Sequence, residues 1–246
     1  NTYITAFNSN MIVNESFFDS ATLRENVVSL ARNIGYLPRS KTSAKATITF
    51  TVGGISSNIS NITLKKGLVC TGNVNDTQET FSITSDIVSN VIDGSATFSN
   101  IDIYQGTFLS KSFTVDSSTE QKFILNNSNI DTSTIKVYVD GIEYFLSDDI
   151  FNINSTSDVY FLSEIQDEKY QLFFGDGLIG KKLENGAIIE INYIVTDGSE
   201  GNGATNFSFS GNFSSNVTSI GAITTIQSSQ NGSEIESIDS IKYYVP

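Results

Sequence analysis

Short apolar runs rich in β-branched and aromatic residues, separated by Asn, Ser, Asp and Gly, dominate this sequence and restrict it to a mainly β fold. Residues 46–52 show the pattern clearly, because Ala46, Ile48, Phe50 and Val52 alternate with threonines. A period of two is typical of a strand with one buried face. The predicted strands cover residues 46–52, 62–65, 67–71, 79–84, 96–104, 108–115, 122–125, 135–139, 142–145, 159–162, 170–174 and 187–195, with a short one around Phe207 and Phe209.

The order of these strands predicts a mainly β chain with an N-terminal helical segment and two small antiparallel β-sandwich or barrel units. We place the helical segment at residues 1–45 and the first β unit at residues 46–115. The second β unit, with a C-terminal extension, is expected at residues 116–246. No sequence repeat recurs at a fixed period, which argues against a solenoid or a propeller.

Two amphipathic helices are predicted in the N-terminal segment. Tyr3, Phe7 and Met11 lie at helical spacing and indicate the first one. A second helix is expected to be capped by Asp19 or Ser20 and to end near Gly35 and Pro38. Its predicted apolar face consists of Leu23, Val27, Leu30, Ala31 and Ile34.

The chain is strongly acidic, with 14 basic and 27 acidic residues and a formal net charge of −13 at pH 7. This charge is unfavourable for binding a phosphate backbone, so we predict no nucleic-acid partner. The acidic residues are scattered, which is typical of a solvated surface, and a basic protein is the partner that would complement them. No apolar run approaches the roughly 20 residues of a spanning helix, so no membrane insertion is predicted.

The sequence contains no histidine, which removes the usual general base and the commonest metal ligand. We therefore predict that the chain is not an enzyme, and we expect no cofactor. The single cysteine, Cys70, lies at strand spacing in the run GLVCT and is predicted to be a core residue rather than a nucleophile.

Two acidic segments were candidates for metal or acid–base chemistry. Asp197, Glu200 and Asn202 lie near glycines, as in a calcium loop, but their spacing misses the EF-hand pattern and favours a plain turn. Asp148 and Asp149 are adjacent, and adjacent residues on a strand point to opposite faces, which favours a solvated loop over a carboxylate pair. We predict no metal site in either segment.

Residues 175–180 read GDGLIG and match the dinucleotide-binding pattern GxGxxG through their three glycines. That pattern requires a following helix, and none is predicted here. Lys181 and Lys182 therefore lose their possible role as a phosphate clamp.

Asn185 and Gly186 instead predict a tight hairpin turn, because Asn-Gly between apolar segments is its strongest short signal. The glycines are then interpreted as backbone turns between strands. The predicted structural turn motif consists of Gly175, Asp176, Gly177, Gly180, Asn185 and Gly186.

Three blocks of sequence together resemble a known family. They are NTYITAFNSNMIVNESFFDSATLRENVVSLARNIGYLPRS at the N-terminus, FFGDGLIGKKLENGAIIEINYIVTDGSEGNG, and GSEIESIDSIKYYVP at the end. In this order they resemble the baseplate wedge subunit of T-even-type contractile-tail phages, within the baseplate J-like group. The chain begins at Asn1 rather than Met, and we interpret it as a fragment of a longer polypeptide.

The resemblance implies a structural role in the virion. Members of the family form the inner ring of the tail baseplate, associate with themselves as dimers and contact other wedge proteins, so this chain is expected in the baseplate after assembly in the host cytoplasm. The resemblance implies no catalytic residues. The alternative is a phage or bacterial surface adhesin, a receptor-binding β module, since Asn- and Ser-rich strands with exposed tyrosines could contact glycans.

Overall fold

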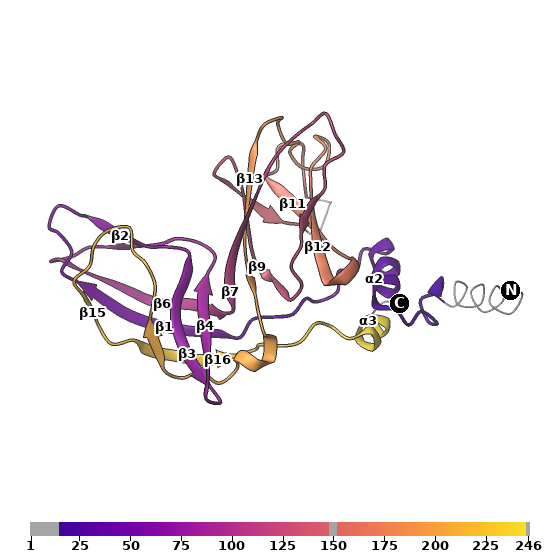
Figure 1. Ribbon diagram of the computed structural model, residues 1–246. Coiled ribbons are helices and arrows are strands. Elements are labelled where there is room, and N and C mark those ends of the chain that lie inside the picture. Colours follow the sequence, from indigo (N-terminus) through magenta and orange to yellow (C-terminus); the bar gives the residue numbers. More distant parts are fainter. Residues whose placement is uncertain (1–14, 148–151, 245–246) are drawn as a thin grey trace, which may run out of the picture.

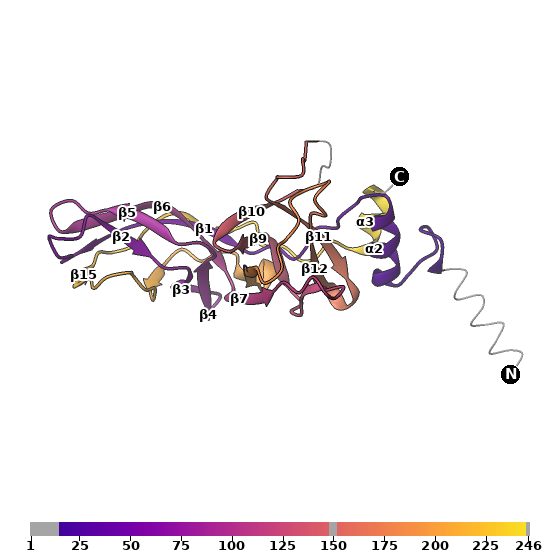
Figure 2. The same cartoon turned by 90° about the horizontal axis from the view of Figure 1, so that it is seen from above.

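The computed structural model describes residues 15–147 and 152–244. Figure 1 shows two β units beside one another, with a pair of helices beyond the second unit. Seen from above in Figure 2, the first unit, the second unit and the helices follow one another along an elongated molecule. The prediction of a mainly β fold with two small β units and an N-terminal helix is confirmed.

The first β unit is a nearly closed barrel. Its sheet has the order β14-β3-β4-β6-β1-β15, with β16 also paired to β1. Residues 203–205 close the barrel against β16, because the Gly203 amide donates to the Ser229 carbonyl and the Ser229 amide donates to the Ala204 carbonyl. The strands are β1 (Lys45–Gly53), β3 (Gly67–Val74), β4 (Thr77–Ile83), β6 (Ser95–Gln105), β14 (Phe207–Phe209), β15 (Ser219–Ile220) and β16 (Thr224–Gln230), and β2 (Asn61–Leu64) with β5 (Ile87–Asn90) forms a separate ribbon.

The alternation in β1 builds the core of this unit. Ile48, Phe50 and Val52 are fully or almost fully buried. The Phe50 ring stacks on that of Phe98 with 5.2 Å between centroids, which adds to the stabilisation from burial alone. Cys70 is completely buried in the same core, and burial raises the pKa of its thiol to about 12. It is a core residue, as predicted.

The second β unit is also a nearly closed sheet, with the order β7-β13-β9-β10-β11-β12-β8. All its neighbouring strands are antiparallel except β10 and β11, which are parallel. The edges β7 and β8 meet through the rings of Phe113 and Phe123, 5.5 Å apart. The strands are β7 (Thr107–Thr114), β8 (Phe123–Leu125), β9 (Ile130–Val139), β10 (Ile142–Leu146), β11 (Val159–Ile165), β12 (Lys169–Phe174) and β13 (Ile188–Val195).

The sheets correct the predicted division at residues 115 and 116. Strand β7 pairs with β13 along its whole length, so the second unit begins before the predicted boundary. The segment from Phe207 onward, which was assigned to the second unit, instead returns to the first as β14, β15 and β16. The reason is that a strand's partner is determined by burial in the whole fold, whereas the sequence pattern reports only the strand itself.

The two ends of the described chain pack against each other. Helix α2 (Arg24–Asn33) buries Val27, Val28 and Ala31, and these contact Ile241 of α3 (Ile238–Tyr244). The predicted second helix is therefore confirmed, whereas the first lies in residues 1–14, outside the described residues. Both β units thus lie, in sequence, between two helices that meet in space. No helix in the described ranges is long and apolar enough to cross a membrane.

The predicted cap of α2 is corrected by the structure. Neither Asp19 nor Ser20 caps the helix; the Glu15 carboxylate accepts the backbone N–H groups of Thr22 at 2.9 Å and Leu23 at 3.2 Å. It also accepts the Asn26 side-chain amide at 2.9 Å. The hydrogen bond from Asn26 has the largest effect on the pKa of Glu15, and with the bonds from the Thr22 hydroxyl and the two amides it lowers that pKa to about 2.

Replacing Glu15 with Gln is expected to lower the melting temperature at neutral pH and to remove one component of acid unfolding. Because the folded pKa of Glu15 is depressed from 4.5 to about 2, its contribution is present above pH 4.5 and is lost as the pH falls toward 2. Melting temperatures of both proteins should therefore converge between pH 4.5 and pH 2. The matched control is Glu120→Gln at an exposed position; an equal effect there would contradict the role of Glu15 in holding the segment before α2.

Candidate functional site at the junction of the β units

Four segments of the chain cross where the two β units meet. Residues 40–44 lead from α2 into β1, Gln105 and Gly106 lead from the first unit into the second, residues 196–201 lead back, and residues 231–236 lead to α3. Gly106 has φ +132°, and a Cβ there would lie 2.3 Å from the Val195 carbonyl oxygen, so only glycine lets the two crossing segments approach so closely. The four segments make this junction the place where the orientation of the units is determined.

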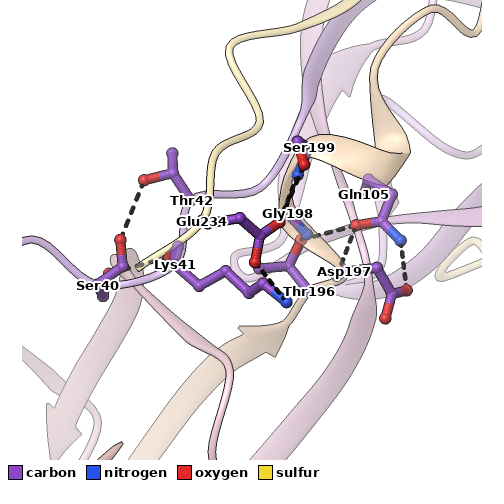
Figure 3. A network of polar contacts seen from close by, with 9 residues as sticks. All are labelled: Ser40, Lys41, Thr42, Gln105, Thr196, Asp197, Gly198, Ser199 and Glu234. Atoms are coloured by element: carbon purple, nitrogen blue, oxygen red, sulfur yellow. Dashed lines mark hydrogen bonds and ion pairs between the residues drawn. The ribbon is translucent and has the colours of Figure 1, made fainter. Parts of the chain in front are cut away.

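The centre of the junction is the buried side chain of Gln105 (Figure 3). Its Nε2 donates to Glu79 at 2.8 Å and to Asp197 at 2.9 Å, and its Oε1 accepts the Thr196 hydroxyl at 2.7 Å and the Asp197 amide at 3.1 Å. A primary amide has two donors and two acceptor positions, and all four are used here. Gln105 therefore joins β4 and the end of β6 in the first unit to the end of β13 in the second.

A second set of contacts fastens the connecting segments to the short helix η2 (Gly198–Gly201). The Glu234 carboxylate accepts the Ser199 hydroxyl at 2.9 Å and forms an ion pair with Lys41 at 3.1 Å (Figure 3). Beside it, the Asn202 side chain makes two hydrogen bonds to the backbone of Gly232, at 2.9 and 2.8 Å. Two of the crossing segments, residues 40–44 and 231–236, also pair with each other at Thr42 and Ser233.

The buried carboxylate of Asp131 binds the segment of residues 40–44, which leads from α2 into β1, to the second β unit. It accepts the Ser43 amide at 2.7 Å and, through its other oxygen, the Ser133 amide at 3.0 Å. Nearby, the Ser40 hydroxyl accepts the Thr132 amide at 3.0 Å. Backbone donors thus compensate the burial of the Asp131 charge.

The units also meet across a cleft of about 500 Å³. Lys66 of the first unit forms an ion pair with Glu190 on β13, and this contact is the main cause of the lowered pKa of Glu190. The Ser85 hydroxyl lies 3.4 Å from the Tyr138 hydroxyl on the same side. Because both charged side chains are about one-third exposed, this contact contributes less than the buried Gln105 network.

We call the two packed helices α2 and α3 the helical end of the molecule. A buried ion pair holds this helical end to the second unit. The Arg24 guanidinium donates to both oxygens of Glu164, at 2.9 and 3.0 Å, and the Glu164 side chain is only 2% exposed. Burial raises the pKa of Glu164, although Arg24 opposes the shift. Arg24 also donates to the Glu236 carbonyl, so one side chain joins α2, β11 and the segment before α3.

The Glu236 carboxylate completes this helical contact. It accepts the Tyr36 hydroxyl at 2.9 Å, the Arg39 amide at 2.9 Å and the Ser240 hydroxyl at 2.7 Å. Burial raises its pKa, but these hydrogen bonds outweigh burial and leave the pKa below its ordinary value. The segments before and after the β units are therefore bound to each other as well as to the second unit.

The residues of the GDGLIG run form a compact loop at the end of β12. The Asp176 carboxylate accepts the amides of Leu178 at 2.8 Å and Ile179 at 2.9 Å, and these bonds lower its pKa. The Gly177 amide donates to the Gly180 carbonyl at 3.1 Å, and both glycines have positive φ. After the loop, Lys182 forms an isolated parallel β-bridge with Gly175. No helix begins at this point of the chain.

Asn185 and Gly186 form a turn but do not close a hairpin, which corrects that prediction. The Ala187 amide donates to the Glu184 carbonyl at 3.2 Å, and Gly186 has φ +85°. The following strand β13 pairs with β7 and β9, not with the preceding β12. The turn is a corner where the chain crosses from one part of the sheet to another, held by the Gly186 amide donating to Val115.

Replacing Gly175 with Ala is expected to destabilise the chain by about 2 kcal/mol or more, because the new Cβ would lie 2.1 Å from the Gly180 carbonyl carbon. The matched substitution Gly186→Ala meets no atom within 4 Å and should cost only about 1 kcal/mol, from its positive φ. Denaturant unfolding of both variants tests this order. Equal losses would show that the loop opens without cost.

The family comparison agrees with the extent of the second β unit. Residues 110–198 match the family described as bacteriophage baseplate wedge protein gp6, third domain, and this range runs from within β7 through the end of β13. The chain is also 30% identical over 227 residues to the baseplate wedge protein gp6 of Enterobacteria phage T4, which covers 84% of this chain. These two matches support a baseplate wedge subunit of T4-like phages.

The matched region accounts for 34% of the phage T4 protein, so this chain spans about a third of the length of that relative. The similarity agrees with the resemblance inferred from the sequence. The alternative of a surface adhesin or receptor-binding module is not favoured by these comparisons.

The predicted turn at Asp197, Glu200 and Asn202 belongs to the junction. Asp197 accepts the Gln105 amide and Asn202 binds Gly232, so these two residues hold segments together. Within the described residues, no three His, Cys, Asp or Glu side chains are grouped so that they could hold a metal ion. Asp148 and Asp149 lie outside the described residues.

The sequence pattern did not identify Gln105, Glu164 or Glu236 as important residues. A signal was available only for Gln105, because it continues the inward alternation of Ile101 and Ile103 into a polar residue. A polar residue at an inward strand position requires partners when it is buried. Glu164 and Glu236 depend on segments far away in sequence and carry no such signal.

Proposed function

We propose that this chain is a structural part of a baseplate wedge in a contractile phage tail, and that it holds two β units and a helical end in fixed relative positions. The observation that carries the proposal is the similarity to the phage T4 wedge protein over 227 residues, which covers 84% of this chain. The chain acts without catalysis and without a cofactor in this proposal.

The hydrogen bonds and ion pairs of the junction support a rigid structural role. Gln105 uses all its hydrogen-bonding positions between the two units, and Arg24 joins three separate segments at the helical end. Fully satisfied buried polar networks favour one arrangement over its alternatives. A displacement imposed on one unit would therefore be passed to the other instead of being absorbed at a hinge.

In this proposal the partners are proteins of the baseplate and a second copy of the same chain, with no contact to nucleic acid or membrane. The net charge of −13 favours basic or uncharged surfaces on those partners. The chain would be assembled into wedges in the host cytoplasm and would remain in the tail baseplate of the finished virion.

Electron microscopy of purified virions with a gold-labelled antibody against this chain tests the location. Label at the baseplate end of the tail is the expected result. Label on the head, or labelled chain found only outside virions, would contradict the proposal. An antibody against the phage head protein provides the control for specific labelling.

A further inference from the structure

A lysine from the first β unit meets a glutamate and an asparagine from the second beside the cleft between the units. Lys66 lies just before β3, and Lys66 and Glu190 both line the cleft. Glu190 and Asn192 lie two positions apart on β13, so their side chains point to the same face of that strand. Glu190 Oε1 accepts a hydrogen bond from the Lys66 ammonium and another from the Asn192 amide nitrogen, the latter at 2.9 Å. The two nitrogens therefore lie within two hydrogen-bond lengths of each other, about 6 Å.

The Asn192 side chain differs from the buried Gln105 amide, whose hydrogen-bonding positions are all used. Asn192 is completely buried, and its Oδ1 has no hydrogen-bond partner within the part of the chain that the structure describes. A buried polar atom without a partner calls for an explanation. Burial also keeps water from the amide carbon Cγ, so hydrolysis does not compete with attack by a neighbouring amine.

The backbone holds Lys66 at the cleft. The Lys66 amide donates to Asp86 at 2.8 Å, which fixes the start of the lysine side chain. An amine held beside an amide reacts far more readily than the two groups would in free solution. The ion pair of Lys45 lacks this combination, because the Asp102 carboxylate also accepts the Thr47 hydroxyl, which has no carbonyl carbon that an amine could attack.

We propose that the Lys66 amine and the Asn192 side-chain amide form an isopeptide bond, with Glu190 transferring the protons, so that the two β units become covalently joined. The reaction begins when the Lys66 ammonium gives a proton to the Glu190 carboxylate and becomes a neutral amine, the form in which lysine is a nucleophile. The Lys66 nitrogen then bonds to Cγ of Asn192, and the electron pair of the carbonyl moves to Oδ1.

The same carboxyl group completes the reaction. Glu190 passes its proton to Nδ2 of Asn192 and takes the surplus proton from the Lys66 nitrogen, as a general acid and base within reach of both. When the carbonyl forms again, the bond between Cγ and Nδ2 breaks and ammonia leaves through the cleft. Ammonia takes the last proton from Glu190, so one ammonium ion carries away the charge that Lys66 had, and no oxidant or cofactor is needed.

The intact mass of the purified 246-residue chain, measured directly and after prolonged incubation, tests the bond. The expected mass is lower by one molecule of ammonia than the sequence requires. In a tryptic digest, the peptide that contains Lys66 should be joined to the peptide that contains Asn192. A succinimide at Asn185 and Gly186 would lose the same mass but would leave these peptides separate, so the digest identifies the bond.

Three variants test the assigned roles. Lys66→Arg keeps a positive charge at this part-exposed position but supplies no neutral amine, and Asn192→Leu removes the amide carbon, so neither should give the joined peptide. Glu190→Gln should slow its formation by about 100-fold or more, the usual contribution of a general acid–base group. The matched control is Glu143→Gln, which removes the ion pair with Lys136 at similar exposure and should leave the rate unchanged. Circular dichroism verifies that each variant keeps its fold.

Two results would overturn the proposal. One is an unreduced mass with two separate peptides in both the fresh and the incubated unmodified chain. The other is a joined peptide that forms at the same rate in Glu190→Gln, because the reaction would then not use this carboxylate. Neither result changes the location of the antibody label on virions, so failure here is distinguishable from failure of the proposed function.

Discussion

Replacing Gln105 with Glu is expected to lower the free energy of unfolding by about 2 to 3 kcal/mol at neutral pH. The substitution keeps the size of the side chain but removes the two donors that bind Glu79 and Asp197, at 2.8 and 2.9 Å. It also places a third carboxylate between these two. Because the position is almost completely buried, solvent cannot compensate the new charge.

The loss should depend on pH in a defined direction. Burial and two neighbouring carboxylates would raise the pKa of the introduced carboxyl group above its unfolded value. The folded variant would then bind a proton more tightly than the unfolded variant, so its relative stability should increase as the pH falls through the raised pKa. Urea unfolding of both proteins at several pH values measures this recovery.

The matched control for this experiment is Gln227→Glu, which introduces the same charge at an exposed position on β16. It should change the stability by less than about 0.5 kcal/mol. An equally small effect at Gln105 would show that the junction tolerates a charge and does not determine the orientation of the units. Small-angle scattering of the Gln105 variant would then show no change in the overall dimensions.

The sequence predicted individual strands more reliably than their partners. Strands such as β1 could be found because Ile48 and Phe50 must point to the core in alternation with threonines. Strand β16 could not, since its sequence TTIQSSQ has no such alternation and its conformation depends on pairing with β1. The same limitation explains why the predicted boundary between the units was misplaced.

The candidate site was less predictable because it consists of single polar residues from distant segments. Thr196 and Gln105 are 91 positions apart, and Arg24 and Glu164 are 140 apart. Neither pair has a spacing that a local motif could reveal. The glycine-rich run around Gly175 had a recognisable pattern but forms a loop, because that pattern describes backbone turns that can occur without a ligand.

Replacing Arg24 with Met is expected to have a comparably large effect, a loss of about 3 kcal/mol from the contact that holds α2 to the second unit. Met preserves much of the apolar stem of Arg but leaves Glu164 buried without its cation. It also removes the donor to the Glu236 carbonyl. Amide hydrogen exchange should show faster exchange in α2 and α3, while the β strands of the first unit should keep their protection.

The pH dependence of this variant tests the cause. The pKa of Glu164 is already raised by burial, and removing Arg24 would raise it further. The folded variant then takes up a proton that the unfolded chain does not hold, so the difference from the unmodified chain should be largest at neutral pH and should shrink as the pH falls through the raised pKa. Arg32→Met on the same helix is the control, because the exposed Arg32 donates to the hydroxyls of Ser29 and Ser163 and not to a buried carboxylate of the described residues. If both variants lost equal stability, or if the loss at Arg24 did not change with pH, the buried charge of Glu164 would not be what couples the helical end to the β units.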